Sequence, residues 1–117
     1  MKKAGQIALM PFPYTDLSHS KRRPVLLLRQ LDSDHDDWLV CMISSQLYQF
    51  VPELDWQLSP EESEFGNTGL KVASVFRLSR IAVLDGQLLS GQLGQISEVR
   101  LHQLKKRLSC WLVDELD

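Results

Sequence analysis

Long apolar runs and an excess of positive charge are both missing from this sequence of 117 residues. Since no apolar run approaches the ~20 residues that span a bilayer, we predict no membrane segment, and we expect no secretory signal because the N-terminal residues lack its long apolar stretch. The formal net charge is −2, so the molecule as a whole does not attract nucleic acid. Any recognition of an anion therefore requires a local cluster of cations.

Cysteines and histidines are few, and they indicate neither a disulfide framework nor a metal site. Cys41 and Cys110 are far apart and have aliphatic neighbours, which predicts buried free thiols in a reducing, cytoplasmic compartment. The histidines, which are His19, His35 and His102, show no metal-type spacing such as H-x-x-x-H. A glycine-rich phosphate loop and a Ser/His/Asp or Cys/His set are also missing, so we expect no metal and no cofactor.

Apolar residues make up 44% of the chain and charged residues 24%, as in an ordinary soluble domain. Short apolar or alternating segments, bounded by proline, glycine and acidic turns, predict strands. The expected strands are 7–10, 24–29, 38–44, 54–58, 70–76 and 81–84, and residues 91–94 are expected to be a loop. Together they predict one mainly β domain, 1–117, with a small curled sheet or barrel of about five to seven strands.

The last segment of the chain predicts an α-helix that packs on this sheet. Ser97 is a good N-cap, and apolar residues then recur at helical spacing. They are Val99, Leu101, Leu104, Leu108, Trp111, Leu112 and Leu116. Most of this apolar face is expected to lie in the core, and Trp111 also makes the helix one candidate for a dimer interface.

A cationic stretch, Lys-Arg-Arg-Pro at 21–24, lies at the mouth of the apolar strand 25–28. Proline is tolerated at the first residue of a strand, so the cations are expected at the end of a rigid element. The neighbouring strand ends in Ser-Ser-Gln at 44–46, and Arg77 and Arg80 lie near the junction of the two late strands. Arginine binds phosphate oxygens through two parallel charge-assisted bonds. Two interpretations stay open at this point: a phosphate-binding site, or ordinary surface cations.

Four motifs follow one another along the chain. They are Gly5-x-Ile7 with PFPYTDLSHSKRRP at 11–24, CMISSQ at 41–46, Gly69-Leu70…Ser74-Val75-x-Arg77, and Leu93-Gly94-x-Ile96-Ser97. In this order they resemble the MazF/PemK-type toxins, the ribonuclease half of bacterial type II toxin–antitoxin pairs. The opening motif is the most specific of the four, and the resemblance covers nearly the whole chain.

The resemblance implies an SH3-like barrel with a C-terminal helix, usually a homodimer. It implies a sequence-selective, metal-independent endoribonuclease that acts on single-stranded RNA, in which the substrate's own 2′-OH attacks the adjacent phosphate. The products are a cyclic phosphate and a free 5′-OH, and no protein nucleophile, metal or cofactor is needed. The protein must position the phosphate and stabilise its extra negative charge. A cognate antitoxin is also implied, with an extended, often acidic tail that occupies the cationic groove.

The resemblance also assigns roles to particular residues. Arg23 matches the family's catalytic arginine, and Ser44 matches a position where many members have threonine as the active-site hydroxyl. The residues implied to contact RNA are Ser18, His19, Ser20, Lys21, Arg22, Gln46 and Arg77. The sequence departs from the family at Gln6, where aspartate is usual, at His19, and at Val83, where threonine is common, which leaves the RNA sequence preference open.

Two other interpretations remain. Gyrase poisons of the CcdB type share the fold and bind a protein without catalysis, but they depend on a C-terminal Trp-Gly-Ile-like tail, which residues 111–117, WLVDELD, lack. A degenerate member would only bind a partner. Growth arrest with intact RNA would favour the first of these, and neither arrest nor cleavage would favour the second.

Overall fold

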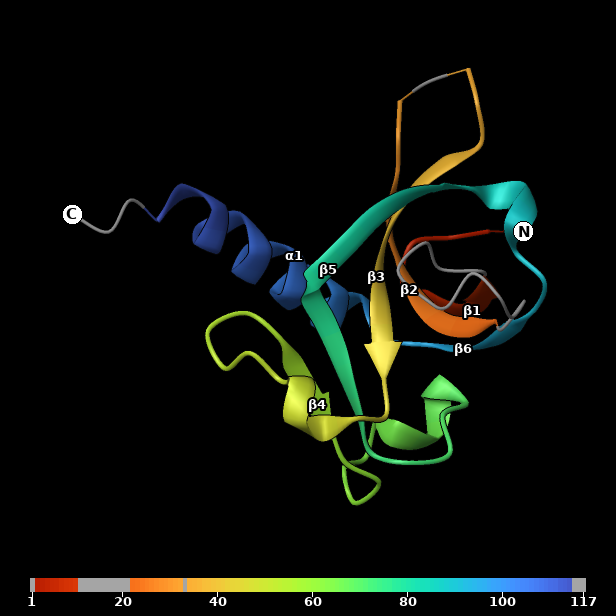
Figure 1. Ribbon diagram of the computed structural model, residues 1–117. Coiled ribbons are helices and arrows are strands. Elements are labelled where there is room, and N and C mark those ends of the chain that lie inside the picture. Colours follow the sequence, from red (N-terminus) through yellow and green to blue (C-terminus); the bar gives the residue numbers. More distant parts are fainter. Residues whose placement is uncertain (1, 11–21, 33, 115–117) are drawn as a thin grey trace.

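The computed structural model describes residues 2–10, 22–32 and 34–114. Within them, six strands form one antiparallel sheet in the order β4-β5-β3-β2-β1-β6, and the helix α1 (Glu98–Val113) follows. The strands are β1 (Gln6–Met10), β2 (Arg23–Gln30), β3 (Asp37–Ser44), β4 (Trp56–Leu58), β5 (Ser74–Asp85) and β6 (Gln92–Gln95). Figure 1 shows that the sheet curls into a half-barrel and that α1 extends away from it. The predicted fold class is thereby confirmed.

The strands predicted at 7–10, 24–29 and 38–44 are confirmed by β1, β2 and β3, and β4 lies within the predicted 54–58. In β2 the residues from Val25 to Leu28 are all buried, because β2 lies between β1 and β3 and both of its faces are covered. Pro24 is the second residue of the strand, after Arg23, and pairs with Leu9.

Each face of the sheet carries an apolar cluster. The larger cluster lies between the sheet and α1, and it includes Leu26, Phe76 and Leu104. The smaller cluster lies on the other face, because successive residues of a strand point to opposite faces. Its buried members are Ala8, Met10, Val25, Leu27, Trp38, Val40 and Met42.

The prediction of two late strands at 70–76 and 81–84 is wrong, because one long strand, β5, runs through both. Its pairing with β3 skips residues 78–80, which bulge out of the ladder. Figure 1 shows β5 bending at its middle. A bulge bends a strand without ending it, whereas its polar residues look like a break between two strands in the sequence.

A buried carboxylate holds this bulge. Asp55 is 0% exposed and accepts hydrogen bonds from the Ser79 backbone N–H at 3.0 Å, the Ser79 hydroxyl at 3.1 Å and the Val51 N–H at 2.9 Å. The Asp55 carbonyl also accepts from Arg107 Nη1 on α1 at 2.8 Å. A buried carboxylate is tolerated only with such partners, and here they connect the bulge, the segment before β4 and the helix.

The loop predicted at 91–94 is also wrong, because β6 pairs with β1 across it. The glycines indicate close backbone approach in place of a loop. A Cβ at Gly94 would lie 2.3 Å from the carbonyl oxygen of Asn67, in the 3₁₀ helix η2 (Phe65–Thr68). Glycine is therefore required where β6 passes η2.

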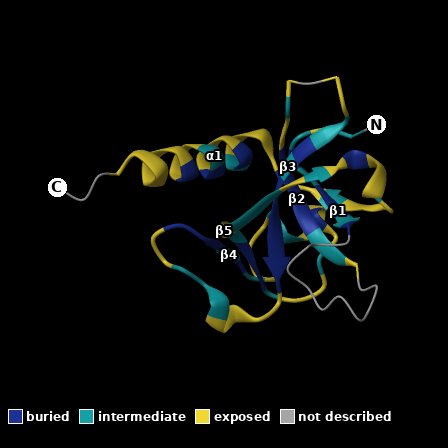
Figure 2. Ribbon diagram, turned by 45° about the horizontal axis from the view of Figure 1, so that its top comes forward, coloured by how far each residue is buried: buried dark blue, intermediate teal, exposed yellow. Residues whose placement is uncertain are grey.

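The helix begins as predicted, since the Ser97 hydroxyl accepts a hydrogen bond from the Arg100 N–H at 3.0 Å. Three leucines of its predicted apolar face are buried, at positions 101, 104 and 108. The other described members are exposed, which corrects the prediction for Val99, Trp111 and Leu112, and Leu116 lies outside the described residues. Figure 2 shows the far end of α1 beyond the sheet, where no strand can cover it.

The two cysteines have different surroundings. Cys41 is buried in β3, as predicted, whereas Cys110 is exposed on α1. The prediction for Cys110 is wrong because the aliphatic residues beside it belong to the part of the helix that leaves the sheet. Among the described residues, no helix is long and apolar enough to cross a bilayer.

Candidate nucleic-acid interface

Arg23 begins β2 and Ser44 ends β3, and both lie at the same end of these two neighbouring strands. The antiparallel pairing of the two strands ends at Val25↔Met42, and Arg23 and Ser44 each lie two positions beyond this pair on their own strand. The ladder stops at Val25 because Pro24 has no N–H to donate. Residues two positions apart on a strand share a face, so Arg23 lies on the face of Val25 and Ser44 lies on the face of Met42. The structure therefore brings together the two residues predicted to be catalytic.

Arg77 reaches the same place from β5. It pairs with Met42, which lies two residues before Ser44 on β3, so Arg77 is the diagonal neighbour of Ser44, about 7–8 Å away along the sheet. Met10, a member of the smaller cluster, pairs with Arg23. The two arginines and the hydroxyl thus lie at the edge of the smaller cluster, on the face away from α1.

The two guanidinium groups have unused hydrogen-bond donors. The Nε atoms of Arg23 and Arg77 are both buried, and neither has a hydrogen-bond partner in the part of the chain that the structure describes. Arg77 does donate from Nη1 to Gln49 Oε1, at 3.4 Å. A buried donor without a partner costs about 1–3 kcal/mol, and an anionic oxygen would remove that cost at both positions.

Ser44 is almost fully buried, and its hydroxyl organises the chain that follows. Its Oγ accepts a hydrogen bond from the Gln46 backbone N–H at 3.0 Å, which turns the chain into the 3₁₀ helix η1 (Leu47–Gln49). No acceptor for the hydroxyl hydrogen lies among the described residues, so Ser44 can still donate to a ligand. Gln49, which binds Arg77, was missed in the sequence analysis; its only signal is a polar side chain one turn after a strand end.

The other residues predicted to contact RNA lie in different parts of the molecule, and some lie outside the described residues. Arg22 is exposed directly before β2, and Gln46 is exposed between Ser44 and η1. Arg80 lies in the bulge of β5, beyond Arg77. The predicted loop contacts Ser18, His19, Ser20 and Lys21 lie outside the described residues.

Two of the departures from the family pattern lie far from the Arg23–Ser44 pair. Gln6 begins β1, four residues before the Met10 that pairs with Arg23, or about 13 Å along the strand. Val83 pairs with Leu39, five residues before Ser44 on β3. Neither side chain can touch a phosphate held between Arg23 and Ser44.

Titratable groups near the sheet have structural roles. Burial raises the pKa of the Cys41 thiol far above its ordinary value, and the nearby Asp55 charge raises it further. The thiol therefore stays protonated and is no nucleophile. The hydrogen bond from Lys2 lowers the pKa of the Asp36 carboxyl, helped by the one from Trp38 Nε1.

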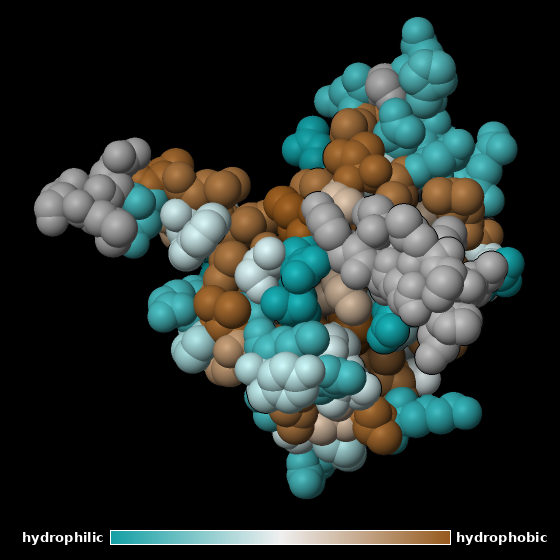
Figure 3. Space-filling model, in the orientation of Figure 1, coloured by the Kyte–Doolittle hydropathy of each residue, from teal (hydrophilic) through white to brown (hydrophobic). Residues whose placement is uncertain are grey.

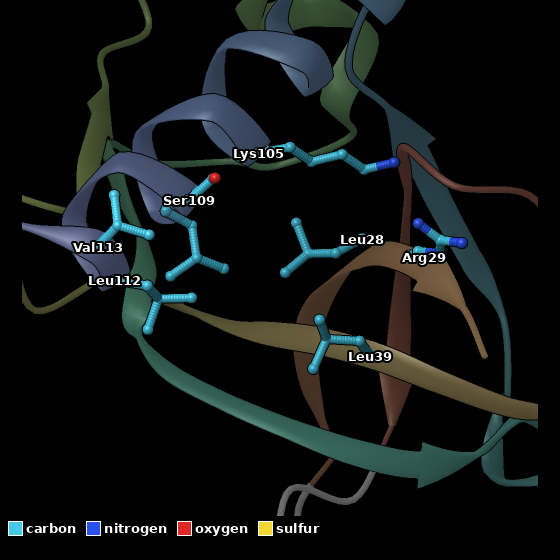
Figure 4. Close-up of a pocket in the computed structure, with 8 residues that line it drawn as sticks. Leu28, Arg29, Leu39, Lys105, Ser109, Leu112 and Val113 are labelled. Carbon is cyan, nitrogen blue, oxygen red and sulfur yellow. The ribbon is translucent and has the colours of Figure 1, made fainter.

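A second surface feature lies on the opposite face of the sheet. An apolar groove of about 250 Å³ separates the far half of α1 from β2 and β3. Figure 4 shows Leu28, Leu39 and Leu112 pointing into this space, and Figure 3 shows apolar atoms continuing along the helix. Sequence analysis missed the groove, although consecutive apolar residues at 111–113 point about 100° apart on a helix and cannot all face one core.

The curled sheet and the arginine–hydroxyl edge define a small β protein with two arginines and a serine hydroxyl at one end of its sheet. The sequence model of the PemK-like, MazF-like toxins of type II toxin–antitoxin systems matches residues 3–112. The chain therefore belongs to this toxin family, and the predicted membership is confirmed.

Solved structures agree with this membership at the level of the fold. One is an endoribonuclease in complex with its cognate antitoxin from a mycobacterial species, with 14% identity, full coverage of both chains (100% and 100%) and a TM-score of 0.67. Another is the Mycobacterium tuberculosis toxin MazF-mt6, with 17% identity, coverage of 93% of this chain and 98% of that one, and a TM-score of 0.63. Among curated protein sequences, no relative matches this chain.

Proposed function

We propose that this protein is an endoribonuclease toxin that cuts single-stranded RNA at a short recurring sequence, without a metal, in the cytoplasm. The observation that carries the proposal is that Arg23 and Ser44 lie at neighbouring strand ends, with Arg77 beside Ser44, in a chain of the PemK/MazF toxin family. Two guanidinium groups with unused Nε donors, next to a free hydroxyl hydrogen, suit a phosphate that gains negative charge.

The reaction needs no nucleophile from the protein. The RNA's 2′-oxygen bonds to the adjacent phosphorus and loses its proton, while the bond from phosphorus to the 5′-oxygen breaks and that oxygen takes up a proton. Arg23 binds the non-bridging oxygens as their charge grows, and Ser44 donates its hydroxyl hydrogen to one of them. Because both side chains stand on strand ends, they keep their positions as the geometry at phosphorus changes.

The remaining predicted residues have supporting roles in this proposal. Arg22 and Lys21 attract the RNA backbone, Gln46 and Arg77 contact the nucleotides beside the cut, and the loop residues Ser18, His19 and Ser20 cover the substrate. A homodimer would place two such cation clusters along one groove. The cognate antitoxin would inhibit the enzyme by laying an extended tail with apolar and acidic residues into that groove.

Purified protein incubated with long RNA in EDTA tests the proposal. We expect cuts at one recurring sequence, with cyclic phosphate and 5′-OH ends. Arg23→Ala and Ser44→Ala are expected to stop or strongly slow cutting without loss of fold. Arg29→Ala is the matched control, because Arg29 is an exposed arginine on the same strand, and its one ion pair among the described residues is with the exposed Asp32 at 3.6 Å.

Several outcomes would count against the proposal. Loss of cutting in EDTA would remove the metal-free mechanism, and an unchanged rate for Arg23→Ala would remove Arg23 from it. Growth arrest with intact RNA would point to a CcdB-like protein-binding toxin. Neither arrest nor cleavage would point to a protein that only binds a partner.

A further inference from the structure

An exposed aromatic ring stands beside the candidate phosphate site. Tyr48, in η1, is 82% exposed, although tyrosine usually buries most of its ring. Its hydroxyl donates a hydrogen bond to Gln46 Oε1. This bond links the ring to the Gln46 amide, and because the ring is so exposed, its faces contact little of its own chain.

The turn that carries Tyr48 is connected to the phosphate-binding side chains at both ends. On one side, the Gln46 backbone N–H donates to Ser44 Oγ. On the other, Gln49 Oε1 accepts from Arg77 Nη1. Tyr48 lies four positions after Ser44, which limits the distance between their Cα atoms to at most about 14 Å. A nucleotide next to a phosphate at Ser44 can reach the ring.

We propose that Tyr48 is a stacking platform for an unpaired base beside the scissile phosphate, and that Gln46 reads the edge of this base. The inference rests on the proposed function and deepens it. Stacking on an aromatic ring is how proteins hold splayed bases of single-stranded RNA, and it tolerates any base because every base has a π face.

The choice of base comes from the Gln46 amide. Since Gln46 Oε1 accepts from the Tyr48 hydroxyl, its Nε2 hydrogens face outward as donors. No acceptor for them lies among the described residues. The amide therefore selects a base that presents an acceptor, such as a ring nitrogen or carbonyl oxygen, at that point. The tyrosine supplies affinity, and its hydroxyl sets the orientation that supplies selectivity.

The competing explanation for the exposed ring is that Tyr48 contacts a partner protein. The hydrogen bonds favour RNA, because the turn is held by Ser44 and Arg77, the groups placed to bind phosphate. A docking surface for a protein would need no such link to the anion-binding residues.

Two variants separate the two parts of the proposal. Tyr48→Ala removes the ring, and we expect RNA affinity to fall roughly ten-fold to one-hundred-fold. Tyr48→Phe keeps the ring but frees Gln46, so we expect near-normal affinity with cutting at a broader set of sequences. Leu88→Ala is the control, because Leu88 is 44% exposed in another 3₁₀ turn, η3 (Gly86–Leu88), and it should change neither property.

Binding is measured with an RNA oligomer that carries a 2′-deoxy nucleotide at the mapped cut site, or with random-sequence RNA if nothing is cut. Thermal unfolding confirms that the exposed substitutions leave the fold intact. If the wild-type protein cuts RNA and Tyr48→Ala binds and cuts RNA equally well, the inference is overturned and the proposed function still stands. Weakened binding of the antitoxin alone overturns it in favour of a protein contact. Wild-type protein that binds RNA without cutting it overturns the proposed function, and a loss of that binding in Tyr48→Ala still supports the stacking site. Wild-type protein that neither binds nor cuts RNA overturns both.

Discussion

The charged side chains at the two ends of β3 differ in whether their polar atoms have partners among the described residues. At its start, Lys2 Nζ lies 2.8 Å from Asp36 Oδ2, and Asp36 Oδ1 also accepts from Trp38 Nε1 at 2.8 Å. At its far end, Arg23 and Arg77 each bury an Nε that has no acceptor among the described residues. The paired end holds the chain together. The unpaired end is a cost to the folded state that a bound anion would offset, which is the physical basis for placing the function there.

Arg23→Lys should produce the largest effect on activity. Lysine keeps the positive charge but loses the planar fork that binds two phosphate oxygens. We expect RNA cleavage to fall roughly one-hundred-fold or more, measured as kcat/KM on an RNA that spans the cut site. Arg29→Lys on the same strand is the control, and equal rates for the two variants would show that charge alone suffices at Arg23.

Asp55→Asn should produce the largest effect on stability. Asp55 is a charged group with all of its partners in place, and an amide nitrogen would face the Ser79 or Val51 N–H in place of an oxygen. We expect the free energy of unfolding to drop by about 2–3 kcal/mol, measured by urea denaturation. A drop similar to that of an exposed change such as Asp32→Asn would mean that the carboxylate does not hold the bulge.

Arg77→Met tests whether the unpaired donor at the far end of β3 lowers stability while serving activity. The apolar side chain keeps the packing of the arginine stem and removes the unpaired Nε. We expect the free protein to gain about 1 kcal/mol in unfolding free energy, while cleavage falls roughly ten-fold because one phosphate contact is lost. Stability and activity are measured on the same preparation. A variant that loses both would show that Arg77 is part of the core packing.

Asp36→Asn addresses the paired end and should have the smallest effect. The pKa of Asp36 is lowered in the folded protein, chiefly by the Lys2 hydrogen bond. A lowered folded-state pKa gives stability above the ordinary carboxyl value of 3.8, and this stability is lost as the pH falls through the lowered pKa. Thermal unfolding of wild type and variant should therefore differ at neutral pH and converge in acid. If the unfolding temperatures of wild type and variant differ by the same amount at all pH values, the Lys2–Asp36 ion pair is not the cause of the difference.

The sequence predicts which residues belong to the candidate site, but it does not predict how they come together in space. Arg23 and Ser44 follow from motifs that are local in the sequence, and their roles remain predictions. Their juxtaposition depends on the β2–β3 register. The contribution of Gln49 and the exposure of Tyr48 depend on how η1 turns after Ser44. No periodic pattern in the sequence predicts these contacts of η1.

The sequence by itself determined the elements whose signals are local: the apolar runs of β1, β2 and β3, and the helix with its Ser97 cap. Only the tertiary structure decided that β5 continues through its bulge, since the carboxylate that holds the bulge comes from Asp55, far away in the chain. It also decided that β6 is a strand, because its hydrogen bonds come from β1, and that the end of α1 is exposed. Strand pairing and burial are made between distant residues, so a local pattern cannot specify them.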